Sequence, residues 1–229
     1  MSYGRVYVLK SMDNFQKVYD LATERDREAA IASYLKYHRL TAEIAKKHGF
    51  TSTIGAAVFA ALSPNNDYWG NLRDADKLLA AARAGKQITD FTVSTYGPNK
   101  RKAWAIAQGE SPDALIVALK TKNFFHNVDD PTDPNWVTID GHMFNVYHGV
   151  RRPIQSKNNK NRVVKVTRWD YIEIAAAVKT FADNYDLLPC QMQGILWITW
   201  RRIHAIHTPS QRELWDRDYH AAGLGFVCS

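Results

Sequence analysis

The spacing of apolar residues is helical over most of the chain. Residues 13–48 carry apolar side chains three and four positions apart, and residues 71–84 repeat this pattern with a polar opposite face. The segment 54–62, IGAAVFAAL, is apolar on every side, which predicts a buried helix. The same criteria, together with caps and turn residues, predict further helices over 100–108, from Pro112, over 170–185 and over 191–204.

The segments between these helices carry the signals of loops. We expect a short strand or arm over 1–10, loops over 129–135 (DDPTDPN) and 151–168, and an irregular tail over 205–229. Strand signals are few, so the predicted fold class is mostly α. Because the sequence shows neither an internal repeat nor a low-complexity linker, residues 1–229 are expected to form a single domain.

The charge balance favours a polyanionic partner, with nucleic acid as the first choice. The net charge is +7 and the sequence pI is about 9.3. Cys190 and Cys228 are too few for an iron–sulfur cluster and provide no disulfide framework, so we expect no cofactor, no metal cluster and a cytoplasmic protein. No apolar run reaches the roughly 18 residues of a membrane span, and no signal peptide is recognisable at the start. We expect no membrane partner, and a monomer.

Basic residues gather in two places along the chain. One is the consecutive group Lys100, Arg101 and Lys102; the other is the segment 141–169, which contains seven basic residues and no acid. Clusters of this kind bind phosphates, so the two groups, with Arg151 and Arg152 foremost in the second, are predicted to contact DNA. A solvated loop is the alternative for the second group. The seven residues are Arg151, Arg152, Lys157, Lys160, Arg162, Lys165 and Arg168.

The segment 137–143, VTIDGHM, is the strongest candidate for chemistry. Apolar and β-branched residues lead up to Asp140, which stands at the start of a short predicted helix over 143–147. There the helix dipole and the free N–H groups favour a charged carboxylate, which is how a fold presents an ionised catalytic acid. The simpler interpretation is that Asp140 only caps the helix, and the two roles are compatible because capping orients the carboxylate.

Three blocks in this order resemble the helix-hairpin-helix DNA glycosylase superfamily. The segment 60–67, AALSPNND, is similar to the Leu-Ser helix end of that family, and 96–106, YGPNKRKAWAI, to the turn before its Lys-Ala helix. The third block joins Lys120-Thr121 to the Asp140 segment, in the manner of the family's hairpin Lys-Thr and Val-Asp-x-His. The likeness covers roughly residues 50–150 and extends to phage-encoded enzymes of this fold.

The resemblance implies a two-lobed helical fold with a degraded helix-hairpin-helix. Ala118 and Leu119 stand where the family has the glycines whose backbone approaches a phosphate. Asp140 would stabilise the oxocarbenium-like sugar as the N-glycosidic bond breaks. Lys120 would form a Schiff base at C1′ if burial or a neighbouring cation such as Lys122 activated its amine, or else contact phosphate. Lys122 is itself predicted to contact DNA.

A flipped base would meet residues of two further segments. Asn65, Asn66, Tyr68 and Trp69 follow the buried helix on a predicted loop, where they would fill the gap left by the base or stack on it; an ordinary turn with Trp69 in the core is the alternative. His142 is the third pocket candidate, beside Tyr68 and Trp69. It has no acidic partner at the spacing of metal ligands, so we expect no metal site.

These features give one favoured function and two rivals. The favoured one is a DNA-binding, base-flipping enzyme that cleaves the N-glycosidic bond of a damaged or modified base. The first rival is an enzyme of the same fold, phage-encoded and acting in the host cytoplasm, that modifies the 5-substituent of a flipped thymine. The second is a DNA-binding protein without catalysis, in which Asp140 is only a cap.

Overall fold

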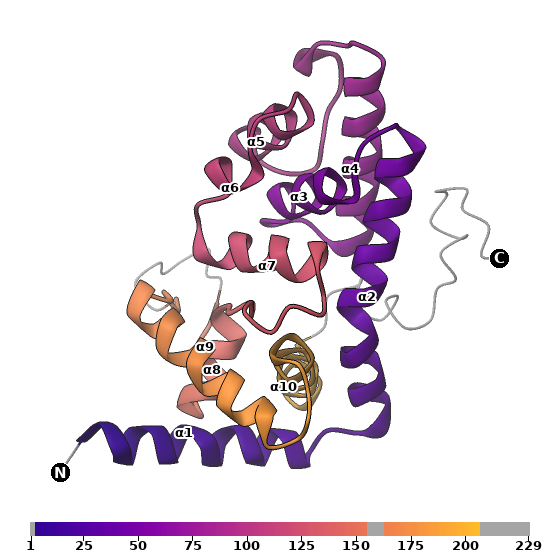
Figure 1. Cartoon of the computed structure of the whole chain (residues 1–229). Coiled ribbons are helices and arrows are strands. Elements are labelled where there is room, and N and C mark those ends of the chain that lie inside the picture. The colour runs from indigo at the N-terminus through magenta and orange to yellow at the C-terminus, as the bar shows by residue number, and fades with distance from the viewer. Residues whose placement is uncertain (1–2, 155–162, 207–229) are drawn as a thin grey trace. The chain divides into compact units, whose positions relative to one another are not determined.

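The computed structural model describes residues 3–154 and 163–206, which are mostly helical and contain no β-strand (Figure 1). The α-helices in chain order are α1 Tyr3–Asp20, α2 Glu24–Lys47, α3 Ser52–Leu62, α4 Tyr68–Arg83, α5 Gly97–Ala107, α6 Pro112–Leu115, α7 Leu119–Asp129, α8 Gly141–His148, α9 Arg168–Asp183 and α10 Pro189–Ile203; a 3-10 turn lies at Ile88–Asp90. The mostly α class is thereby confirmed.

Two of the predicted boundaries are wrong. The strand or arm expected over 1–10 is instead the first half of α1, which begins at Tyr3. Once a helix is nucleated, each further residue adds a backbone hydrogen bond, and this gain outweighs the local preferences of the β-branched residues. The loop expected to carry Tyr68 and Trp69 ends earlier, because the Asp67 side chain accepts a hydrogen bond from the Gly70 N–H and so starts α4 at Tyr68.

The chain divides into two compact units, and each is described by itself. Unit 1 comprises residues 1–35 and 131–206, and within it α8 packs against α1, α9 and α10. Its core is rich in aromatic residues: the Phe15 ring lies 5.9 Å from Tyr147 and 5.6 Å from Phe181. The ring contacts tie α1 to α8 and α9, so the short α8 is held on several sides by longer helices.

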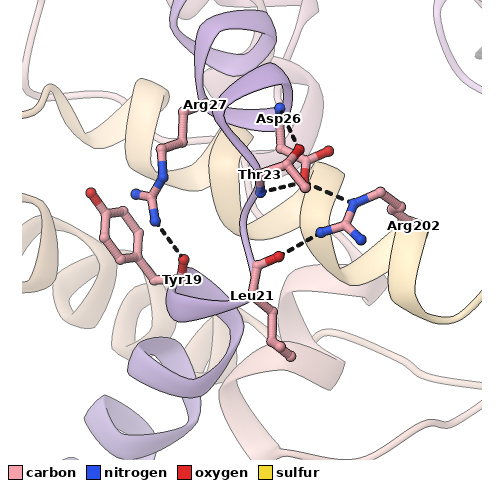
Figure 2. A network of polar contacts seen from close by, with 6 residues as sticks. All are labelled: Tyr19, Leu21, Thr23, Asp26, Arg27 and Arg202. Atoms are coloured by element: carbon pink, nitrogen blue, oxygen red, sulfur yellow. Dashed lines mark hydrogen bonds and ion pairs between the residues drawn. The ribbon is translucent and has the colours of Figure 1, made fainter.

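A polar network joins the turn between α1 and α2 to the end of α10 within unit 1 (Figure 2). Asp26 is buried, and its Oδ2 accepts hydrogen bonds from the Thr23 N–H at 2.9 Å and the Arg202 Nε at 2.8 Å. Arg202 also donates to the Leu21 carbonyl at 2.5 Å. One guanidinium therefore binds both a buried carboxylate and a backbone carbonyl of the same turn.

Unit 2 comprises residues 36–130 together with 207–229, of which the last range lies outside the described residues. Its centre is α3, buried from Gly55 to Leu62 and packed against α4, α5 and α7. A side chain at Gly55 would bring its Cβ within 2.4 Å of the Thr41 carbonyl oxygen, so glycine is needed for the close approach of α2 and α3. The apolar run of the sequence thus predicted the central helix correctly.

Candidate active site around Asp140

The segment before Asp140 is held by hydrogen bonds to one side chain. Val137 and Ile139 are buried, and the Tyr171 hydroxyl donates to the Val137 carbonyl at 2.9 Å and accepts from the Ile139 N–H at 3.2 Å. Burial raises the pKa of Tyr171 well above its ordinary value, so the phenol remains a neutral donor. One tyrosine of α9 therefore sets the position from which Asp140 projects.

Asp140 caps α8, as the sequence predicted. Its Oδ1 accepts hydrogen bonds from the His142 N–H at 2.9 Å and the Met143 N–H at 3.1 Å, while its Oδ2 accepts one from the Trp197 Nε1–H at 3.0 Å. All three groups donate to the carboxylate, which suits its ionised form at a helix N-terminus. A cap needs only one of the two oxygens, so the bond from Trp197 goes beyond what capping requires.

Two residues of α10 that sequence reasoning did not place in the site complete its surroundings. Trp197 is only partly buried, and its indole reaches Asp140. The Arg201 guanidinium lies over the Trp197 ring, 4.3 Å from its centroid. Burial lowers the pKa of Arg201 to about 10, and the charge of Asp140 acts in the opposite direction. Arg201 is thus a cation at neutral pH beside an anion, and its spacing of four from Trp197 on one helix was the available signal.

His142 lies close to Trp197. Its ring is 5.9 Å from the Trp197 ring in an edge-to-face arrangement. Of the predicted site residues, the structure therefore brings His142 and Asp140 together and adds Trp197 and Arg201 to them.

Lys120 and Lys122 belong to unit 2, whereas Asp140 belongs to unit 1. Lys120 is exposed in the first turn of α7, so the burial that would activate its amine is not present. Lys122 forms an ion pair with Asp113, with 2.9 Å between Nζ and Oδ1. At the turn between α6 and α7, Ala118 has φ −70° and ψ 124°, a conformation open to any residue. The turn therefore forms without the missing glycines.

The basic group on α5 has two different environments. The Lys100 ammonium donates to the Ile88 carbonyl at 2.6 Å and to that of Phe91, and lies 4.2 Å from the centre of the Phe91 ring. Lys100 therefore links α5 to the segment before it. Arg101 is exposed and Lys102 is partly exposed, and DNA contact by these residues stays a prediction.

The four candidate residues that follow α3 lie in different environments. Trp69 is 3% exposed and packs in the core of unit 2, where its ring lies 4.8 Å from that of Tyr68. Asn66 donates to Asp74 Oδ2 at 3.0 Å. Asn65 is exposed, with a left-handed φ of 59° that asparagine tolerates. Asn65 is thus the exposed residue of this group, and its contact with DNA stays a prediction.

The second basic group surrounds the base of the loop 151–168. Arg151, Arg152, Lys165 and Arg168 are exposed, whereas Lys157, Lys160 and Arg162 lie outside the described residues. Arg151 donates to the His204 carbonyl at 3.1 Å. Asn145 binds the Arg152 backbone on both sides, from its Nδ2 to the carbonyl at 2.8 Å and from the Arg152 N–H to its Oδ1 at 3.3 Å. The Arg152 backbone is thus fixed to α8 through Asn145.

A protein-family model described as a family of unknown function (DUF7178) matches residues 5–204. This range includes the ten α-helices of the described residues except for the first two residues of α1. The chain belongs to the DUF7178 family. Comparisons with curated proteins and with solved structures find no match. In the DUF7178 region that the structure describes, no helix is long and apolar enough to cross a membrane, and no group of three or more His, Cys, Asp or Glu side chains is arranged to hold a metal ion.

Proposed function

We propose that this protein is a DNA-binding, base-flipping enzyme that cleaves the N-glycosidic bond of a damaged or modified base, in a two-lobed fold of the helix-hairpin-helix glycosylase type. The observation that carries the proposal is the carboxylate of Asp140, which caps α8 and is held at both oxygens. The order of sequence blocks that resemble the superfamily is the second support.

The chemistry that we assign to Asp140 is electrostatic. As the bond between C1′ and the base nitrogen breaks, its electron pair leaves with the base and positive charge develops on the sugar. A fixed carboxylate stabilises this cation and accepts a proton from the water that adds to C1′. This proton passes through solvent to the nitrogen of the departed base, which leaves the carboxylate ionised again. The products are the free base and an abasic site.

The geometry favours a monofunctional enzyme over one that also cleaves the strand. Strand cleavage by a Schiff base requires a neutral amine, which proteins obtain by burying a lysine or by placing another cation beside it. Lys120 is exposed, and the charge of the neighbouring Lys122 is paired with Asp113. We therefore expect base release without a covalent complex that borohydride can trap.

The two rival functions remain outcomes of the test. An enzyme that alters the 5-substituent of thymine would use the same basic surfaces but no attack at C1′. A DNA-binding protein without catalysis would use Asp140 only as a cap, and the backbone donors to Oδ1 fit that role equally well.

The experiment compares two capping aspartates. Wild type, Asp140→Asn and Asp67→Asn are incubated with oligonucleotides that carry uracil, oxidised, alkylated or 5-substituted bases, and base release is measured by mass spectrometry. Asp67 is the matched control, because its Oδ1 caps α4 through the Gly70 N–H at 2.9 Å. We expect Asp140→Asn to lower the rate by at least about a hundredfold and Asp67→Asn to leave it within about twofold.

Three results would contradict the proposal. Equal loss in both variants, in step with their stability, would make Asp140 a structural cap. A mass change on a 5-substituted thymine without base release would favour the base-modifying rival. DNA binding with no change in any substrate would leave only the DNA-binding protein.

A further inference from the structure

An exposed tryptophan stands among the cations at the start of α9. The side chain of Trp169 is 77% exposed, the largest exposure of any large apolar side chain in the described part of the chain. Arg168 precedes it directly, and Lys165 lies four residues before it. An aromatic ring exposed beside cations is an arrangement on which an unpaired base can stack.

The basic residues on the other side of the loop lie beside this group. The Val164 N–H donates to the Pro153 carbonyl at 3.0 Å, so the segment ending at Arg152 and Pro153 runs next to the one leading to Lys165. We call Arg151, Arg152, Lys165, Arg168 and Trp169 the Trp169 surface. Its residues come from two chain segments that are bonded to each other and to α8 through Asn145.

Two acidic residues of α9 face the same region, and both are engaged. Asp170 accepts hydrogen bonds from the Thr167 N–H at 2.9 Å and hydroxyl at 2.6 Å, in the capping box of α9. Glu173 accepts one from the Tyr147 hydroxyl at 2.7 Å. Four cations against two bonded acids leave the Trp169 surface positive, which suits a polyanion.

The Trp169 surface is continuous with the candidate active site. Ile154 follows the Arg151–Pro153 segment and packs on Gly141, the residue after Asp140: a Cβ added at Gly141 would lie 3.1 Å from two carbon atoms of Ile154. At the other end, Arg151 is bonded to His204, which follows α10, the helix that carries Trp197 and Arg201. The backbone that carries this surface is therefore in contact with the elements that hold Asp140.

We propose that the Trp169 surface binds a single-stranded segment of nucleic acid, with the four cations on its phosphates and the indole of Trp169 stacked on an unpaired base. Stacking between an aromatic ring and a base requires that the face of the base be free, which duplex pairing prevents. The inference deepens the proposed function, on which it rests for the choice of DNA, because it names the strand state of the nucleic acid beside Asp140.

The test measures binding of the full chain to three oligonucleotides of equal length by fluorescence anisotropy: a thymidine strand, an abasic strand and a duplex. We expect Trp169→Ala to weaken binding to the thymidine strand by roughly tenfold, within the range of one base stack, and Trp169→Phe to restore part of it. Binding to the abasic strand should change less than about twofold, since it offers no base to the indole.

Two control variants separate the ring from the charges. Ile172→Ala removes another exposed apolar side chain of α9 and should leave binding unchanged. The double variant Arg151→Ala and Arg152→Ala should weaken binding to all three oligonucleotides and reduce the salt dependence by about two phosphate contacts, whereas Trp169→Ala should leave the salt dependence as it is.

The proposal is overturned if Trp169→Ala weakens binding to the abasic strand or the duplex as much as binding to the thymidine strand. It is also overturned if Ile172→Ala weakens binding as much as Trp169→Ala does. A third contrary result is that anionic phospholipid vesicles compete with the strand for wild type but not for Trp169→Ala, because Trp169 would then act as a membrane contact and not as a base-stacking residue. These results are independent of base release. If the protein releases no base from any substrate but its binding to the thymidine strand still depends on Trp169, only the proposed reaction is refuted.

Discussion

Replacing Arg202 with alanine tests whether the polar network of Figure 2 stabilises unit 1. The substitution removes the hydrogen bond of 2.8 Å to Asp26 and the one of 2.5 Å to the Leu21 carbonyl. Asp26 keeps the bond from the Thr23 N–H, but its side chain, only 8% exposed, loses its neutralising cation. The variant therefore leaves a largely buried carboxylate with its charge uncompensated.

The magnitude follows from the burial of the two partners. Breaking a fully buried pair costs about 3–5 kcal/mol, and an exposed pair contributes at most about 1 kcal/mol. Asp26 is close to the buried limit, whereas Arg202 is 40% exposed, so water replaces part of what is lost. We expect Arg202→Ala to lower the free energy of unfolding by about 2 kcal/mol, which for a chain of this length lowers Tm by about 4–8 °C.

The assay is thermal and urea unfolding followed by circular dichroism, with Lys47→Ala as the control. Lys47 pairs with Asp76 at 3.0 Å in unit 2, where both side chains are more open to solvent, and its removal should cost no more than about 0.5 kcal/mol. Arg202→Lys should recover part of the loss, because the lysine restores the positive charge beside Asp26. Recovery should be incomplete, because one ammonium does not reproduce the planar guanidinium that binds two acceptors. A loss no larger than that of Lys47→Ala, or strict additivity with Asp26→Asn, would refute the reasoning.

Two further predictions concern titratable groups of unit 1. Burial lowers the pKa of His148 below 6.5, and the charge of Arg152 acts in the same direction. As the pH drops below about 6.5 the unfolded chain therefore takes up a proton before the folded one does, and stability falls. His148→Gln should reduce the pH dependence of the free energy of unfolding between about pH 7 and pH 5, and an unchanged dependence would contradict this. Burial raises the pKa of Cys190 to about 11, and its thiol lies 3.4 Å from the Pro131 carbonyl oxygen. In a Cys228→Ser background, iodoacetamide at neutral pH should therefore label the native protein at least about tenfold more slowly than the urea-unfolded protein. Equal labelling rates would contradict the burial of Cys190.

The sequence predicted what depends on local pattern. The buried α3 follows from an unbroken apolar run, and the cap at Asp140 from an acid placed before a helix. The start of α4 at Tyr68 was missed because Ser63 to Asn66 signal a break, while the capping of Asp67 acts only after them. The contact between Asp140 and Trp197 joins residues that are far apart in the chain, and no spacing rule predicts such a pair. The candidate site could therefore be found from sequence by its acid but not by its α10 residues.

The bond from Trp197 also determines how an Asp140→Asn variant must be interpreted. An asparagine at this position can turn its carbonyl oxygen either toward the His142 and Met143 N–H groups or toward the indole N–H of Trp197. In either case its NH₂ group then faces the remaining N–H donor, and no hydrogen bond forms between two donors. Asp67 Oδ1 accepts a hydrogen bond from the Gly70 N–H, and the carbonyl oxygen of an asparagine in its place can accept the same bond. Asp140→Asn should therefore cost more stability than Asp67→Asn, and Trp197→Phe, which removes the second donor, should return part of that loss. If activity fails to return with stability in the double variant, the negative charge of Asp140 is needed for the reaction itself.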